Sequence, residues 1–204
     1  MPGPEPVPAV PAATHYATRN DAFSPATTWV IDGTQLRAQD AGGPPRAVAL
    51  ADVVEVRLTF APTRPEPNRF RCTLLTRSGG RLGWFNRTYQ GLGDFRDTST
   101  GYTEFVRALH AALVCHAPAC RFVAGASPAR YAVSVGATAF VALVIVVAAL
   151  LLVINGLAWL ILIKLVLLAV FLPNAVRWLT RNRPRPYASG AIPPELLPDG
   201  PRRI

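Results

Sequence analysis

Residues 131–172 read YAVSVGATAFVALVIVVAALLLVINGLAWLILIKLVLLAVFL, and this stretch decides the fold of the chain. It carries a single charge, Lys164, and one polar break, at Asn155 and Gly156. A bilayer core about 30 Å thick needs about 20 apolar residues in a spanning helix, so the run is long enough for two. The sequence therefore predicts a transmembrane hairpin of two helices over residues 131–179, with its tip at residues 155–156.

Three aromatic residues lie near the expected ends of these helices. Trp and Tyr are enriched at membrane–water interfaces, where the ring is apolar and its polar atom stays wet. We therefore expect membrane anchors at Tyr131, Trp159 and Trp178. A re-entrant or interfacial second segment is the alternative, but residues 157–172 are apolar on all faces, whereas an interfacial helix has a polar face.

Basic residues flank the hairpin and are absent from its tip. Arg121 and Arg130 precede the first helix, and four more lie at the end of the second, namely Arg177, Arg181, Arg183 and Arg185. Because positive loops stay in the cytoplasm, we expect both termini there, in the inner membrane of a bacterium. The four arginines are also candidates for contact with anionic lipid, although orienting the hairpin is a sufficient role for them.

Lys164 is the one charge expected at membrane depth. An ionisable residue in a spanning helix is a functional-site hypothesis by default, in an ion path or an oligomer core. Neither predicted helix contains an Asp or Glu that could pair with it. Snorkelling of its long stem toward the headgroups, or a contact between subunits, is therefore the simpler interpretation.

The region before the hairpin predicts a disordered leader and one small domain. Residues 1–13 contain five prolines and one charge, which predicts a disordered leader over residues 1–27. Short alternating segments then predict six or seven antiparallel strands, among them 29–31, 35–37, 46–50, 52–60, 70–74 and 82–85. Residues 102–114 carry an apolar stripe at helical spacing, with Thr100 as the expected N-cap. We predict an α+β membrane protein with a small antiparallel β barrel or sandwich, capped by one helix, over residues 28–125.

This order of elements resembles a bacterial pleckstrin-homology-like domain. The resemblance is carried by WVI at 29–31, LADVVEVR at 50–57 and the helix at 102–114. The tail at 180–204, with RNRPRPY at 181–187 and IPPELLP at 192–198, is similar to the ends of a group of uncharacterised bacterial membrane proteins. Lipid-binding members of the domain family use a basic cluster at the first hairpin, where this chain has Asp32, Gly33 and Thr34. The resemblance implies an architecture and no chemistry.

No residue pattern in the sequence names a reaction. The net charge is +9, and most of the excess of basic residues flanks the hairpin and forms no stripe with aromatic residues, so a nucleic-acid partner is excluded. Cys115, His116 and Cys120 lack the spacing of a zinc site. His110 lies off the apolar stripe of the helix, and no nucleophile or phosphate-loop motif occurs. We therefore expect no catalytic residues, no metal, no cofactor and no small-molecule substrate.

The most consistent hypothesis is a membrane-anchored binding or scaffolding module that is not an enzyme. Its partners are the lipid bilayer and either another protein or further copies of the chain. The candidate contact surfaces are Arg57, Arg69 and Arg71 on the sheet and the Pro-rich loop 62–67. The alternative is a small oligomeric transport or channel subunit that uses the hairpin and Lys164.

Overall fold

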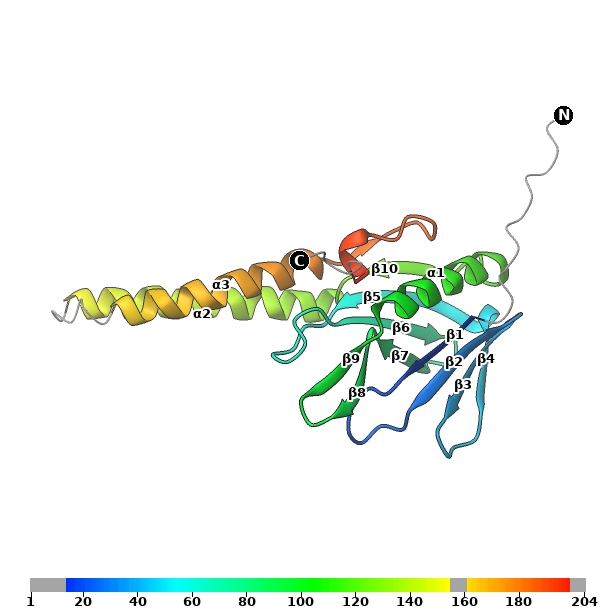
Figure 1. Ribbon diagram of the computed structural model, residues 1–204. Coiled ribbons are helices and arrows are strands. Elements are labelled where there is room, and N and C mark those ends of the chain that lie inside the picture. The colour runs from blue at the N-terminus through cyan, green and yellow to red at the C-terminus, as the bar shows by residue number, and fades with distance from the viewer. Residues whose placement is uncertain (1–13, 155–160, 199–204) are drawn as a thin grey trace. The chain divides into compact units, whose positions relative to one another are not determined.

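The computed structural model describes residues 14–154 and 161–198 (Figure 1). Two compact units are present. Unit 1 combines the chain up to Val123 with the chain from Pro186 onward, and unit 2 runs from Ala124 to Arg185. Unit 1 contains antiparallel sheets and one long helix, while unit 2 is dominated by two helices. The predicted α+β class is confirmed.

The first sheet of unit 1 is a four-stranded antiparallel meander. Its strands follow one another in the order β1 (Thr14–Thr18), β2 (Thr27–Asp32), β3 (Gln35–Asp40) and β4 (Arg46–Ala49). Gly33, at a φ of +55°, makes the tight turn between β2 and β3, and a two-residue connection of this kind favours glycine. The predicted disorder of residues 1–27 is wrong for residues 14–18, because β1 pairs with β2 and buries Tyr16.

The second sheet has the order β11-β10-β5-β6-β7. Its strands are β5 (Val53–Phe60), β6 (Phe70–Thr76), β7 (Arg81–Phe85), β10 (Arg121–Ala124) and β11 (Arg185–Pro186), and a short helix, η1 (Leu50–Asp52), leads into β5. A separate hairpin consists of β8 (Arg87–Gly91) and β9 (Asp94–Asp97). The described strands form these three sheets and no closed barrel, so the barrel alternative is wrong.

Helix α1 (Ser99–His116) packs on the sheets through the predicted stripe. Tyr102, Phe105, Val106, Leu109 and Leu113 are all buried. Thr100, however, is not the N-cap. The N-cap is Thr98, two residues earlier, and the carboxylate of Asp97 accepts the backbone N–H of Ser99 at 2.9 Å.

Aromatic side chains join the two larger sheets to α1. The rings of Trp29 on β2 and Trp84 on β7 lie 4.8 Å apart, and Phe105 of α1 lies 5.4 Å from Trp84. Tyr16 of β1 stacks on Phe105 at 5.7 Å. Trp84 and Phe105 are fully buried. Large buried rings contribute most of the apolar area in such a small core, so these contacts fix how the sheets and the helix pack.

The C-terminal segment is part of unit 1. The backbone N–H of Tyr187 donates to the carbonyl of Phe122 at 3.1 Å. Further along, η3 (Pro194–Leu196) contacts β5, and Leu196 and Leu197 are buried. The residues that the sequence analysis assigned to a tail therefore return to the domain that precedes the hairpin.

Unit 2 consists of α2 (Pro128–Ile154) and α3 (Ile161–Arg181), which lie side by side (Figure 1). Within the described residues, α2 alone has the length and composition to cross a membrane, and its most apolar window is entirely unburied. Pro173 lies inside α3. One membrane-spanning candidate therefore stands where the sequence predicted the first helix of the hairpin.

Candidate functional site

The predicted membrane anchors lie on the helices of unit 2 where they are described. Tyr131 is half-buried in the first turn of α2, and Trp178 is half-buried near the end of α3. Trp159 and the predicted tip at residues 155–156 lie outside the described residues. Lys164 belongs to α3, but its side chain is outside the described part of the chain. The anchor role and the intramembrane charge stay predictions.

The two ends of the helix pair meet at a close junction. The backbone N–H of Ala126 donates to the carbonyl of Asn182 at 3.0 Å. Gly125 adopts a φ of +80°, and a Cβ atom there would lie 2.5 Å from the same carbonyl oxygen. Only glycine fits such a position without strain. The segment that enters α2 is therefore bound directly to the segment that leaves α3.

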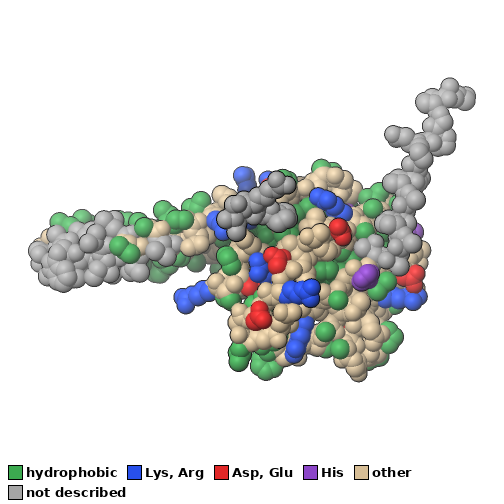
Figure 2. Space-filling model, viewed as in Figure 1, with side chains coloured by type: hydrophobic (Ala, Val, Ile, Leu, Met, Phe, Trp, Pro, Cys, Tyr) green, Lys and Arg blue, Asp and Glu red, His purple; other side chains and the backbone are tan. Residues whose placement is uncertain are grey.

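The predicted lipid-contacting arginines gather at this same end of unit 2. Arg177 and Arg181 lie in the last turns of α3 and are half-buried, whereas Arg183 and Arg185 follow the helix and are exposed. Arg130, at the start of α2, is exposed as well. Figure 2 shows hydrophobic side chains along the described helix pair, and mixed basic and acidic side chains on the β-rich unit. The contact of these arginines with anionic lipid stays a prediction.

The three sheet arginines proposed as a contact surface do not form one free patch. Arg57 pairs with Glu55 at 2.7 Å, and Arg121 reaches the other oxygen of that carboxylate at 3.2 Å. Arg69 lies over the Phe85 ring at 3.6 Å. Arg71 is exposed, also near Phe85, at 5.3 Å from the ring centre. Among the described residues, no carboxylate pairs with Arg71.

The Pro-rich loop 61–69 is held by a buried ion pair. Glu66 is 1% exposed, and its carboxylate lies 3.3 Å from the guanidinium of Arg69. Burial lowers the pKa of Arg69, and the neighbouring Glu66 partly offsets that effect. Thr63 and Glu66 also exchange backbone hydrogen bonds, of 3.0 and 3.2 Å. The loop therefore has a defined shape, with Arg64 exposed near its tip.

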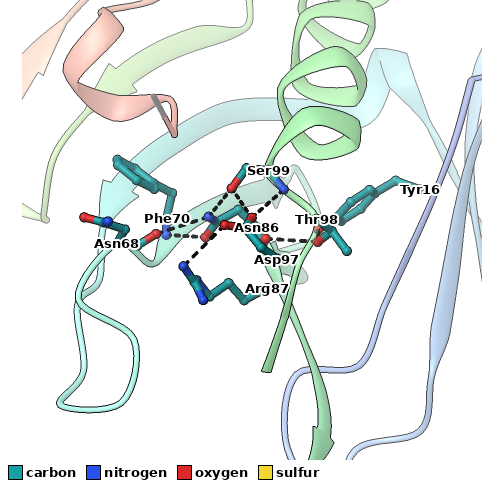
Figure 3. A network of polar contacts seen from close by, with 8 residues as sticks. All are labelled: Tyr16, Asn68, Phe70, Asn86, Arg87, Asp97, Thr98 and Ser99. Atoms are coloured by element: carbon teal, nitrogen blue, oxygen red, sulfur yellow. Dashed lines mark hydrogen bonds and ion pairs between the residues drawn. The ribbon is translucent and has the colours of Figure 1, made fainter. Parts of the chain in front are cut away.

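Asn86 connects this loop to the start of α1 (Figure 3). Its side-chain oxygen accepts the N–H of Phe70 at 2.7 Å, and its amide nitrogen donates to the carbonyl of Asn68 at 3.1 Å and to Ser99 Oγ at 3.0 Å. Asn86 is fully buried. A buried amide with all of these partners stiffens its surroundings. Sequence reasoning missed this network, because nothing local marks Asn86 as buried.

His110 is not off the core, as the sequence analysis placed it, but is 2% exposed. Its Nδ1 lies 2.7 Å from the carbonyl of Val106, and its Nε2 lies 2.8 Å from the hydroxyl of Tyr187. Burial lowers the pKa of His110 to about 4, so the ring is neutral at pH 7. Neutral His110 thus links α1 to the C-terminal segment.

The described residues bring together no set of side chains that names a reaction. Within residues 14–154 and 161–198, no group of three or more His, Cys, Asp or Glu side chains could hold a metal. Burial raises the pKa of Cys72 and raises that of Cys120 to about 11, which makes both thiols poor nucleophiles. Cys115 is exposed. The expectations of no metal, no cofactor and no catalytic activity stay predictions.

Comparison of the chain with protein-family models, with curated proteins and with solved structures gives no match. The resemblance to pleckstrin-homology-like domains therefore stays a prediction. Any functional conclusion depends on the geometry of the two units themselves.

Proposed function

We propose that this chain is a membrane-anchored binding or scaffolding protein without catalytic activity. A helical hairpin of two spans tethers a pleckstrin-homology-like domain to the cytoplasmic face of a bacterial inner membrane, with both termini in the cytoplasm. The domain engages a protein partner or a second copy of the chain. Tethering raises the effective concentration of both partners at the surface, so a modest contact suffices for assembly.

The observation that carries this proposal is the unburied apolar surface of α2. A soluble protein covers such a helix with other parts of its core, because exposed apolar area is costly in water. Here Phe140, Leu143, Val146 and Leu150 are each at least 60% exposed. Lipid is the environment that suits this surface.

The chain returns to unit 1 after the helix pair. This return supports two proposals, that α3 is a second membrane span and that both termini lie on the same side of the membrane. Val123 and Pro186 belong to the same compact unit. A chain that leaves one folded domain through a spanning helix must cross the bilayer again to rejoin it. α3 is the helix that precedes the return. The basic end formed by Arg130 and the arginines after α3 favours the cytoplasmic side.

The order of elements in unit 1 supports a pleckstrin-homology-like domain. Four antiparallel strands are followed by three more in a second sheet, and α1 then packs against both sheets. The β8–β9 hairpin and the C-terminal segment add to that plan. The transport alternative depends on Lys164, whose side chain lies outside the described residues, so no observation favours it.

Arg71 and Phe85 offer the clearest surface for an acidic protein partner. Arg is enriched at interface hot spots, and an aromatic ring beside it adds apolar area. The test is purification of the full chain from native membranes in mild detergent, with mass spectrometry of bound proteins. We expect a stoichiometric partner whose recovery falls in Arg71→Glu and is unchanged in Arg107→Glu, an exposed position on α1. A monomer that purifies alone, or equal recovery by both variants, contradicts the binding role.

A further inference from the structure

The chain leaves unit 1 at a definable end of that unit. α1 begins beside Asn86, which also binds the backbone at Phe70, opposite Phe60 at the end of β5. α1 then contacts η1 near its other end, where β5 begins. β10 lies beside β5, with Arg121 at its start reaching Glu55, and Figure 1 shows the two strands running in the same direction. The exit at Ala124 therefore lies toward the end of β5 that carries the loop 61–69.

Two fully exposed apolar side chains protrude near this end. Leu92, in the turn of the β8–β9 hairpin, is 101% exposed, and Phe23, in the loop between β1 and β2, is 98% exposed. A backbone hydrogen bond of 3.0 Å from Thr98 to Asn86 closes the base of the β8–β9 hairpin, and the Thr18 hydroxyl at the end of β1 donates to the carbonyl of Arg87 at 3.4 Å. The hairpin and the β1–β2 loop therefore begin at the same place in unit 1 (Figure 1). We call Phe23, Arg64 and Leu92, together with the turns that carry them, the exit surface.

Hydrogen bonds connect the turn that carries Phe23 with the hairpin that carries Leu92. The backbone N–H of Tyr89 donates to the carbonyl of Arg19 at 2.8 Å, and the Arg19 guanidinium lies 5.3 Å from the centre of the Tyr89 ring. The same guanidinium donates to the carbonyls of Ser24 and Ala22, at 3.0 and 2.8 Å. Phe23 is therefore held out in water by a network of hydrogen bonds, although burying such a ring is favourable.

The tether between the two units limits how far this surface is from lipid. Residues 125–127 alone separate β10 from α2. A fully extended chain covers at most about 3.6 Å per residue, so Ala124 lies within about 14 Å of the first residue of α2. With α2 in a bilayer, Ala124, where the chain leaves unit 1, stays close to the headgroups whatever the angle between the units.

We propose that the exit surface contacts the same bilayer that anchors the chain. Leu92 and Phe23 enter the headgroup layer, and Arg64 contacts lipid phosphates. This inference rests on the proposed membrane anchoring and adds a second, peripheral contact to it. That contact restricts the rotation of unit 1 on its tether and presents a fixed face of the domain to the cytoplasm.

The chemistry of the exit surface suits lipid better than a protein partner. A stable protein interface buries about 1,200–2,000 Å² in total, over a continuous patch. Leu92 and Phe23 are single tips on separate turns, each with polar neighbours such as Asp94 and Asp21. Isolated apolar tips can enter a fluid headgroup layer without a matching pocket. The mixed charges fit zwitterionic lipid, so the contact does not require a purely anionic surface.

The test is a fluorescence measurement on the full chain in phosphatidylcholine nanodiscs. Leu92→Cys, made in a Cys115→Ser background, is labelled with the environment-sensitive dye NBD, since Cys72 and Cys120 are buried. The matched control is NBD on the native Cys115, which is exposed near the other end of α1. We expect a blue shift for the Leu92 position and quenching by doxyl-labelled lipid, with neither change at Cys115.

Each alternative outcome has a distinct meaning. If the chain is recovered with the nanodiscs but the dye at position 92 is not quenched, the proposed contact between the exit surface and lipid is wrong. The proposed membrane anchoring is then still supported. A blue shift without lipid quenching means that protein covers Leu92, which also overturns the proposal. Failure of the chain to stay with the nanodisc contradicts the anchoring itself. Phe23→Cys, tested in the same way, gives an independent second reading.

Discussion

The imidazole Nε2 of His110 lies 2.8 Å from the hydroxyl of Tyr187, although the two residues are separated in the sequence by the whole helix pair. Their rings are nearly parallel, with centroids 5.9 Å apart, and Phe122 packs on the same imidazole at 4.9 Å. Because His110 Nδ1 donates to the carbonyl of Val106, Nε2 is the acceptor for the Tyr187 hydroxyl. This contact fastens the returning chain to the domain.

Tyr187→Phe should destabilise unit 1 while leaving its packing unchanged. The substitution leaves the buried Nε2 of His110 without a donor, which costs about 1–3 kcal/mol. Thermal denaturation of the full chain in detergent, followed by near-UV circular dichroism, should show a lower Tm. Arg107→Ala, on the exposed face of the same helix, is the control and should leave Tm unchanged. An unchanged Tm in Tyr187→Phe would mean that the hydrogen bond contributes nothing.

Acidification should weaken unit 1 through His110. The pKa of His110 is about 4 in the folded protein, below its ordinary value of 6.5, because burial disfavours the charged ring. The unfolded state therefore binds more protons between these values, and stability present above pH 6.5 is lost as the pH falls toward 4. The loss amounts to about 3 kcal/mol at 1.36 kcal/mol per pKa unit.

The measurement for this prediction is the free energy of unfolding at several pH values, in the wild type and in His110→Gln. Gln keeps a polar group at the site but does not titrate. Carboxylates also titrate in this range, so the difference between the two proteins is the quantity that matters. It should shrink as the pH falls from 6.5 to 4. A difference that is constant over this window would contradict the neutral buried His110.

Arg69→Ala should be strongly destabilising, because it leaves Glu66 buried and unpaired. Removing one member of a buried ion pair costs about 3–5 kcal/mol, whereas removing both costs less. The double variant Glu66→Ala/Arg69→Ala should therefore be more stable than Arg69→Ala alone. Chemical denaturation of the wild type, Glu66→Ala, Arg69→Ala and the double variant gives the coupling energy. Additive effects would show that the 3.3 Å contact between these two side chains is not a significant interaction.

Gly125→Ala should disrupt the protein, whereas Gly136→Ala should be tolerated. A Cβ at Gly125 would lie 2.5 Å from the carbonyl oxygen of Asn182, at a φ of +80°, so this variant should disrupt the junction. A Cβ at Gly136 meets nothing within 4 Å, and alanine favours a helix over glycine by about 1 kcal/mol. We expect a lower yield of monodisperse protein for the first variant and an unchanged yield for the second. Equal yields would contradict a tight junction.

Much of the architecture could be predicted where a periodic pattern was long. The apolar run predicted α2, alternation at 52–60 predicted β5, and the stripe at 102–114 predicted α1. For β5 and α1 the burial of one face decides the structure, and for α2 the length of the apolar run does. The turn at Gly33 was also predictable, since a tight hairpin turn favours glycine.

The parts that were missed depend on contacts between distant segments. β1 has few apolar residues and follows a Pro-rich stretch, yet pairing with β2 and the burial of Tyr16 hold it in the sheet. The β8–β9 hairpin is short and polar. His110 is buried because Phe122 and Tyr187 cover it, and both lie outside its helix. Arg69 was predicted on an exposed contact surface with Arg57 and Arg71, but it is half-buried and pairs with Glu66, whose burial the sequence did not indicate.

We propose that the chain leaves one cytoplasmic domain through the first membrane span and rejoins the same domain after the second. The accessibility of single cysteines in spheroplasts tests this topology most directly. The native Cys115 and an introduced Ser189→Cys lie before and after the helix pair, and Asn155→Cys marks the predicted tip. We predict that an impermeant maleimide labels only position 155 in intact spheroplasts, and labels 115 and 189 after permeabilisation. Labelling of 115 and 189 from opposite sides of the membrane would contradict the account.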